Sequence, residues 1–151
     1  MVKRNKFKSE VQQLESMLYA KQISPTAMRL LVLEFLLKQP VAYSLSDLEN
    51  EFDRSDRTTL YRTLKTFEEK GLIHPIQDGM GATKYALCDD DCKDGIHDDL
   101  HLHFYCNSCH ETFCLPAIKI PEVQLPQHFI SQEFSLVAKG TCAKCSDKTM
   151  Q

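Results

Sequence analysis

Two Cys-x2-Cys pairs constrain this chain more than any other feature of its sequence. Cys106 and Cys109 form the first pair, Cys142 and Cys145 form the second, and 32 residues separate them. Each pair can give two sulfur ligands to one ion, and four thiolates complete the tetrahedral shell of a structural Zn²⁺ site. Redox pairs or buried free cysteines are the alternative, but two such pairs together favour zinc. Zinc binding would then supply part of the folding free energy.

Composition and charge narrow the class of protein. The cysteine count of seven is odd, and the basic start of the chain lacks the apolar run of a secretory signal, which together argue against a disulfide framework. No stretch of 18 apolar residues occurs, so we expect no membrane span and a cytoplasmic location. Residues 1–84 carry 13 Lys and Arg against 11 Asp and Glu, a net charge of +2, and residues 85–151 carry 5 against 10, a net charge of −5. The first part could therefore meet a polyanion.

The first half of the sequence has the pattern of helices. Ser24 and Pro25 predict the N-cap and the first residue of a helix that continues through the apolar stretch TAMRLLVLEFLLKQ. The motif SDLE fits a capping box and predicts a short second helix that begins near Ser44 or Ser46.

A third helix is expected from a cap at Ser55 or Asp56 to Lys70, with Gly71 as its C-terminal stop. The stretch GLIHPIQDGMGATKYAL that follows predicts two short strands around a glycine-rich turn. Three helices followed by a hairpin is the order of a winged helix-turn-helix, in which the third helix enters a groove of DNA.

One face of this third helix carries the residues that we assign to DNA binding. Arg and Lys side chains can bind phosphates, and Thr and Tyr can contact a thymine methyl group in the major groove. A solvated, charged helix face is the alternative. The residues are Arg57, Thr58, Thr59, Tyr61, Arg62 and Lys65.

An acidic, turn-like segment, residues 88–99, separates the two halves and is interpreted as a hinge. Beyond it, LHLHFYC, ETFCLP and FSLVAKGTC have the pattern of strands, whereas AIKIPEVQLPQHF is ambiguous because its two prolines limit a helix to short pieces. We therefore expect an α/β chain of two domains, a winged helix over residues 1–87 and a zinc-binding domain with a small sheet over residues 100–151.

The quoted motifs also resemble a known family. SPTAMRLLVLEFL, TTLYRTLKTFEEKGLI and HLHFYCNSCHETF, with a late GTCAKC, are similar in kind and order to the ferric uptake regulator family of bacterial metal-sensing repressors, over roughly residues 20–146. His110 departs from the pattern, because the family usually has Gly there. The resemblance implies a DNA-binding winged helix and a C-terminal α/β dimerisation domain, and hence a homodimer on a palindromic double-stranded operator. It also implies that the four-cysteine zinc is structural and that a second metal, bound between the domains, is the corepressor.

At the second site this chain departs from the iron and peroxide sensors of that family. They share a His near the start of the second helix, where this chain has VAYSLSDL. They have an acid after the aromatic residue of the second wing strand, where this chain has Ala86, and a later acid where it has Cys114.

A different ligand set resembles that of the zinc uptake regulators within the family: His74, Cys88, His101 and His103. His101 and His103 are two residues apart, so a strand would point both to one face. Three imidazoles and one thiolate suit tetrahedral Zn²⁺ better than iron. We therefore expect a zinc-responsive repressor of metal-uptake genes. The alternatives without a metal are a solvated His74, a small buried hydrophobic residue at Cys88 and a polar strand face at His101 and His103.

Other possibilities stay open from the sequence. Cys114 or Cys92 could replace one regulatory ligand, and the sensed metal could be Fe²⁺ or Mn²⁺ in an iron- or peroxide-responsive regulator. Cys88, Cys92 and Cys114 could instead form a redox switch. A zinc enzyme is least expected, because the H-x-E and P-C-x-x-C motifs of a deaminase are absent. The acidic segment could bind a weak extra cation, and three further histidines have weaker claims as ligands: His97, His110 and His128.

Overall fold

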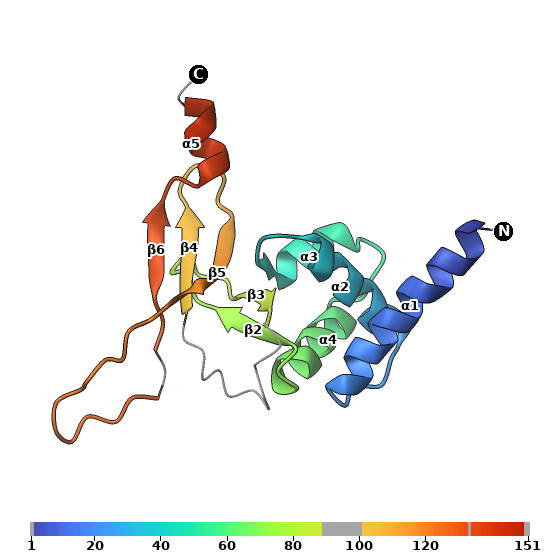
Figure 1. The fold of residues 1–151 in the computed structure, drawn as a ribbon, viewed down its shortest axis with the longest axis horizontal. Coiled ribbons are helices and arrows are strands. Elements are labelled where there is room, and N and C mark those ends of the chain that lie inside the picture. Colours follow the sequence, from blue (N-terminus) through green and yellow to red (C-terminus); the bar gives the residue numbers. More distant parts are fainter. Residues whose placement is uncertain (1, 89–100, 133, 150–151) are drawn as a thin grey trace.

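The computed structural model describes residues 2–88, 101–132 and 134–149, and within these ranges it describes side chains from Lys8 to Lys148. Four helices lie together on one side of the molecule (Figure 1): α1 (Val2–Ala20), α2 (Ala27–Lys38), α3 (Leu45–Glu51) and α4 (Arg57–Glu69). A first sheet has the strand order β1-β3-β2: β1 (Tyr43–Ser44), β2 (Ile73–Ile76) and β3 (Lys84–Leu87). A second sheet has the order β5-β4-β6, followed by α5 (Ala143–Thr149): β4 (His101–Cys106), β5 (Thr112–Lys119) and β6 (Val137–Gly140).

Helix α4 forms as its sequence predicts. The Asp56 carboxylate caps it by accepting the Thr59 N–H at 2.9 Å. After the helix ends, Gly71 adopts a φ of +67°, a left-handed conformation that favours glycine. The inward face of α4 is fully buried in the main hydrophobic core and consists of Leu60, Leu64 and Phe67.

The helix start predicted for α2 is displaced, whereas α3 begins after Ser44, one of the two predicted positions. The cap of α2 is Thr26 rather than Ser24, because the Thr26 hydroxyl accepts the Arg29 N–H at 3.3 Å, and Pro25 therefore lies before the helix. The capping box of α3 uses Ser44 with Asp47, since the Asp47 N–H donates to the Ser44 hydroxyl while the Asp47 carboxylate accepts the Ser44 N–H. Helix α1, the two-residue strand β1 and helix α5 have no counterpart among the predicted elements.

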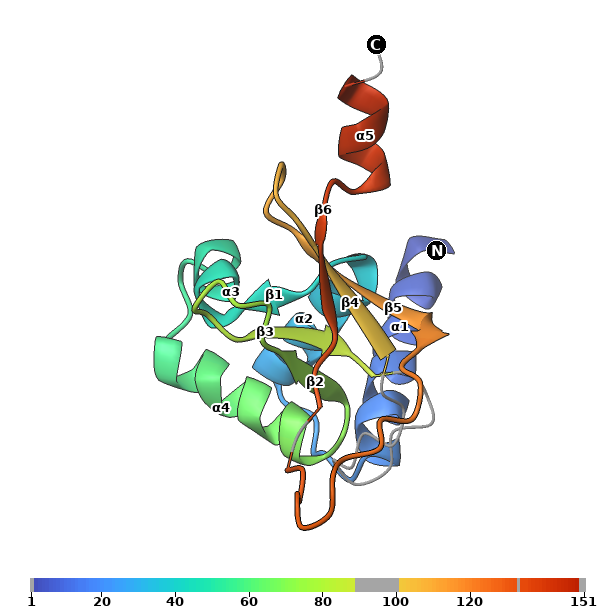
Figure 2. The same ribbon diagram turned by 90° about the vertical axis from the view of Figure 1, so that its left-hand side faces the viewer.

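The two-domain α/β architecture is confirmed. Hairpin β2–β3 pairs antiparallel, with His74 opposite Ala86 and Ile76 opposite Lys84, and it lies between the helices and the second sheet (Figure 1). In the second sheet β5 is antiparallel and β6 parallel to the central β4. Helix α5 extends from the end of this sheet, away from the helices α1–α4 (Figure 2).

Two further sequence predictions can be compared with the structure only for the described residues. Of the hinge assigned to residues 88–99, only Cys88 is described, so both domain boundaries stay predictions, and Cys92 and His97 lie outside the described residues. Among the described residues, no helix combines the length and the apolar character needed to cross a membrane.

Candidate metal centres

The four cysteines of the two Cys-x2-Cys pairs meet at one end of the second sheet. Cys106 ends β4, Cys109 follows in the turn, Cys142 precedes α5 and Cys145 lies within its first turn. Their sulfur atoms all lie within 4.8 Å of one another and form no disulfide. The predicted convergence of segments that are far apart in sequence is therefore present.

The geometry of this group fits a tetrahedral zinc shell. Zinc–sulfur bonds of about 2.3 Å give sulfur–sulfur edges of about 3.8 Å, and the sulfurs of Cys109 and Cys142 are 3.8 Å apart. The Cys142 N–H donates to the Cys106 sulfur at 3.3 Å. Backbone N–H donors from Cys109 and Cys142 lower the pKa of the Cys106 thiol to about 6, which favours the thiolate that zinc requires. Contact with Cys142 and burial raise the pKa of Cys145.

A second group of metal-binding side chains lies between the two domains. His74 comes from β2, His101 and His103 from β4, and Cys114 from β5. One donor atom from each lies within 4.8 Å of the others. His74 is buried and the other three residues are half-buried. The strand alternation predicted for His101 and His103 thus brings both rings to one site, together with a residue of the winged domain.

Distances within the second group are those of a metal shell for two of its contacts. The Nε2 atoms of His74 and His103 are 3.2 Å apart, and Cys114 Sγ lies 3.6 Å from His74 Nε2. Tetrahedral zinc with ordinary bond lengths would separate two nitrogens by about 3.3 Å and a nitrogen from a sulfur by about 3.6 Å. The contact of His101 Nε2 with Cys114 Sγ is shorter, at 2.8 Å.

The protonation of His103 also suits a ligand. Burial, followed by the neighbouring His101, lowers the pKa of His103 to about 4, so its ring is neutral at pH 7, the form that binds metal. Its Nδ1 is buried and, among the described side chains, is the one buried nitrogen or oxygen without a hydrogen-bond partner. The ring meets the other donors through its opposite nitrogen, Nε2, and the convergence of four donor atoms within 4.8 Å is the observation by which the donor set passes the test for a metal site.

Cys88 lies beside this group but outside it. Its sulfur is 3.5 Å from Nδ1 of His74, whereas Cys114 contacts Nε2 of the same ring. The structure thus brings together three of the four predicted regulatory ligands, with Cys114, the named substitute, in place of Cys88. The weaker histidine candidates, His110 and His128, belong to neither group, and His110 Nδ1 instead lies 2.8 Å from the Tyr105 hydroxyl.

The residues assigned to DNA binding divide into two sets on α4. Thr58, Tyr61 and Arg62 are exposed, with 47 % of Tyr61 accessible. The other three have partners within the chain: Arg57 pairs with Glu49, Lys65 donates to Glu68 at 2.7 Å, and Thr59 bonds to the Asp56 carboxylate.

Sequence reasoning missed a buried polar cluster at the domain junction. It consists of Asp78 in the wing turn, Lys84 on β3 and Thr112 on β5. No motif marks these residues, because their contacts are formed only by the tertiary fold.

Comparisons with known proteins identify the family. The model of the ferric uptake regulator family matches residues 20–138. A zinc uptake regulator solved with zinc and DNA is similar in fold, with a TM-score of 0.63 and 20 % identity over 95 % of this chain and 97 % of that one. The Vibrio cholerae ferric uptake regulator has a TM-score of 0.56 and 21 % identity over 85 % of this chain and 98 % of that one.

A zinc-bound manganese uptake regulator is a third similar structure, with a TM-score of 0.58 and 15 % identity over 85 % of this chain and 98 % of that one. A comparison with curated proteins finds no match. At these identities the solved structures show the fold alone, whereas the family model spans more than half of the chain. On that match the chain belongs to the ferric uptake regulator family, whose members are metal-responsive transcription regulators and not enzymes.

Proposed function

We propose that this chain is a zinc-responsive transcriptional repressor that acts as a homodimer on a palindromic DNA operator and controls metal-uptake genes. The observation that carries the proposal is the second donor group, which takes His74 from the winged domain and His101, His103 and Cys114 from the sheet domain. A metal ion bound by this group would contact all four donors only when the two domains hold one relative position.

The chemistry of the donors supports zinc over iron or manganese. Three imidazoles and a thiolate are borderline to soft ligands, whereas manganese favours carboxylate and water oxygens, and iron sensing is expected to use more oxygen ligands. No Asp or Glu belongs to this group among the described residues. Zn²⁺ bound there would supply a crosslink between the domains without redox chemistry. A separate, structural zinc ion would be held by the four cysteines, Cys106, Cys109, Cys142 and Cys145.

The DNA-binding part of the proposal depends on α4. The helix exposes Thr58, Tyr61 and Arg62 on the face opposite its buried apolar stripe, and the β2–β3 hairpin follows it as a wing. Two such helices in a dimer would enter successive major grooves of a palindrome. Metal binding that favours the DNA-competent domain arrangement by about 1–3 kcal/mol would tighten operator binding about 5- to 150-fold.

The test combines metal analysis with DNA titration. Purified protein should carry two zinc ions per chain, one of which a chelator removes without unfolding. A duplex selected from a random pool in the presence of Zn²⁺ should bind the dimer, lose affinity on chelation and regain it at lower free Zn²⁺ than Fe²⁺ or Mn²⁺. Restoration by Fe²⁺ in preference to Zn²⁺ would instead make the chain an iron-responsive regulator.

A ligand variant separates the two metals. His101→Ala should keep the structural zinc and the dimer but lose the zinc dependence of DNA binding. His128→Ala is the matched control, since His128 is exposed and lies outside both donor groups. A normal zinc response in His101→Ala would contradict the site.

A further inference from the structure

Thr112 joins the two domains through three hydrogen bonds. Its carbonyl accepts the Ala42 N–H at 2.8 Å. Its hydroxyl donates to the Asp78 carboxylate at 2.7 Å and accepts from the Lys84 ammonium at 2.9 Å. Thr112 belongs to β5 of the sheet domain and is fully buried, whereas its three partners belong to the winged domain. One residue therefore contacts the segment before β1, the wing turn and β3.

In this cluster the carboxylate of Asp78 is buried, the ammonium of Lys84 is half-buried, and both are hydrogen-bonded. The side chains of Lys84 and Asp78 are 13 % and 0 % exposed and form an ion pair at 2.9 Å. The Lys84 ammonium also donates to the His110 carbonyl at 3.2 Å, and the second carboxylate oxygen of Asp78 accepts the Met80 N–H at 2.9 Å. Burial raises the pKa of Asp78, but hydrogen bonds from Lys84, Thr112 and the Met80 N–H outweigh it and leave that pKa below its ordinary value. Such a network fixes one geometry, because a lost partner strands a buried charge.

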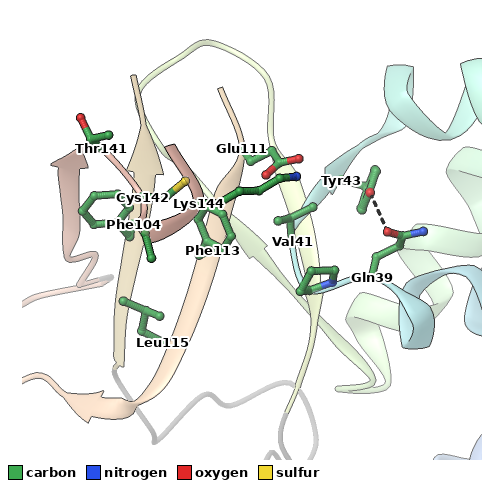
Figure 3. A pocket seen from close by; sticks show the side chains of 12 residues that line it. Gln39, Val41, Tyr43, Phe104, Glu111, Phe113, Leu115, Thr141, Cys142 and Lys144 are labelled. Atoms are coloured by element: carbon green, nitrogen blue, oxygen red, sulfur yellow. Dashed lines mark hydrogen bonds between the residues drawn. The ribbon is translucent and has the colours of Figure 1, made fainter. Parts of the chain in front are cut away.

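Apolar contacts between the domains, which Ala42, Ile76 and Ala86 make with Cys114, cover only part of the junction. A cavity of about 600 Å³ opens between them (Figure 3), with Val41 and Tyr43 on one side and Phe104, Phe113 and Leu115 on the other. Because the cavity removes packing contacts from this part of the junction, the relative position of the domains depends on the contacts around it.

The polar cluster and the regulatory ligands both use β5 and the β2–β3 hairpin, and on each the two groups are two residues apart. On β5, Thr112 lies two residues before Cys114. In the wing hairpin, Lys84 is opposite Ile76, and His74 is opposite Ala86, again two residues along each strand. Fixing Thr112 against Lys84 therefore also fixes the alignment at which His74 meets Cys114.

We propose that Thr112 is a positioning residue, and that its bonds to Asp78 and Lys84 hold the wing against β5 in the alignment that assembles the regulatory metal site. The proposal rests on the proposed function for the metal. The bonds of Thr112 to Asp78 and Lys84, called the Thr112 anchor below, need no metal themselves. Binding to a site that is assembled only part of the time is weakened by that fraction. Loss of a buried hydrogen bond that leaves charged groups without a partner should lower the equilibrium constant for assembly about tenfold, and zinc affinity at this site by up to the same factor.

The experiment uses the full chain with its structural zinc in place. Thr112→Val removes the hydroxyl and keeps the shape of the side chain. Thr83→Val is the matched control, because the Thr83 hydroxyl accepts from Gln77 at 2.7 Å within the wing. Thr112→Ser restores the hydroxyl. The first readout is zinc affinity at the second site by chelator competition, and the second is hydrogen exchange of the Ala42 amide by NMR, measured without the second zinc.

The anchor predicts a distinct pattern. Thr112→Val should weaken zinc binding by up to about tenfold and speed exchange at Ala42 about tenfold, while the Leu72 amide, bonded to the Phe67 carbonyl within the winged domain, keeps its rate. Thr83→Val and Thr112→Ser should resemble the parent. Parent-like affinity and Ala42 exchange in Thr112→Val would overturn the proposal.

Two further results remain decisive. If Thr112→Val does not retain structural zinc, Lys84→Met replaces it, with the same expected changes and the same overturning result. If the parent binds no second zinc, the proposed function fails, and Ala42 exchange alone decides: faster exchange in Thr112→Val upholds the anchor, and an unchanged rate overturns it.

Discussion

Among single residues, Cys114 has the strongest bearing on metal choice. It stands where the resemblance to iron and peroxide sensors implies an acid, and it places a sulfur 3.6 Å from His74 Nε2. Cys88 approaches the other nitrogen of the same ring, at 3.5 Å. When one ring nitrogen of a histidine binds a metal ion, its other nitrogen usually contacts a neighbouring group, which orients the imidazole without touching the ion. The two cysteines would therefore have different roles at one histidine.

Separate serine substitutions should distinguish these roles. We expect Cys114→Ser to weaken zinc binding at the second site by more than about 100-fold, because it removes a thiolate ligand, and Cys88→Ser to weaken it about tenfold, as for an outer partner. Both should retain the structural zinc. Chelator competition measures the affinities, and the opposite order would restore Cys88 as the fourth ligand that its sequence position indicates.

For helices and strands, local signals predict α4, the β2–β3 hairpin and the strands β4, β5 and β6, but they miss α1, β1 and α5 and misplace the start of α2. Asp56 and Gly71 carry caps whose chemistry acts within a few residues, and both act as predicted. For α2, Ser24 and Thr26 are both acceptable caps, and only the folded chain shows that the Thr26 hydroxyl meets a helix N–H. Helix α5 is short and begins beside Cys142, so its formation depends on the tertiary arrangement of the cysteines rather than on its own sequence.

The same division applies to the two metal centres. The four-cysteine group was predictable because ligand spacing is a local property that survives any loop length between the pairs. The choice between Cys88 and Cys114 was not predictable, since it depends on which nitrogen of the His74 ring each cysteine approaches. Thr112 could not be found at all, as its partners lie 28 and 34 residues away.

The cap of α4 should contribute measurably to stability. Asp56→Ala removes the acceptor for the Thr59 N–H and hydroxyl, and we expect it to lower the free energy of unfolding by about 1 kcal/mol. Asp53→Ala, at a nearby exposed position, should change it by less than about 0.5 kcal/mol. Urea denaturation of the zinc-loaded proteins measures both, and equal effects would mean that the bond to Thr59 contributes little.

The exposed face of α4 should govern DNA binding. Arg62→Ala should weaken operator binding and reduce the slope of log K against log salt by about 0.9 if Arg62 neutralises one phosphate. Lys148→Ala, an equal loss of charge on α5, should leave the slope unchanged. Fluorescence anisotropy over a salt series tests this, and an unchanged slope for Arg62→Ala would remove that residue from the phosphate contacts.

In the whole molecule, the two candidate metal centres differ in what they connect. All ligands of the four-cysteine group lie within the sheet domain, where they hold the end of β4 to the segment that leads into α5. The second group spans both domains and lies two residues along the strands from the Thr112 anchor. The first should therefore determine whether the sheet domain folds, and the second should determine only how the domains are positioned.

Stepwise chelation should separate these effects. A mild chelator is expected to remove the regulatory zinc ion with no loss of secondary structure by circular dichroism, because the sheet domain keeps its four-cysteine zinc ion and the winged domain keeps its own core. A stronger chelator should remove the structural zinc ion and unfold the sheet domain, since a structural zinc site of this kind contributes about 10 kcal/mol or more to folding. Cys142→Ser should give the fully chelated state directly, with disrupted β4–β6 amide signals in NMR spectra while those of Leu60 and Leu64 persist. Loss of both sets of signals together would mean that the winged domain depends on the sheet domain for its stability, and the two metals could then not act independently.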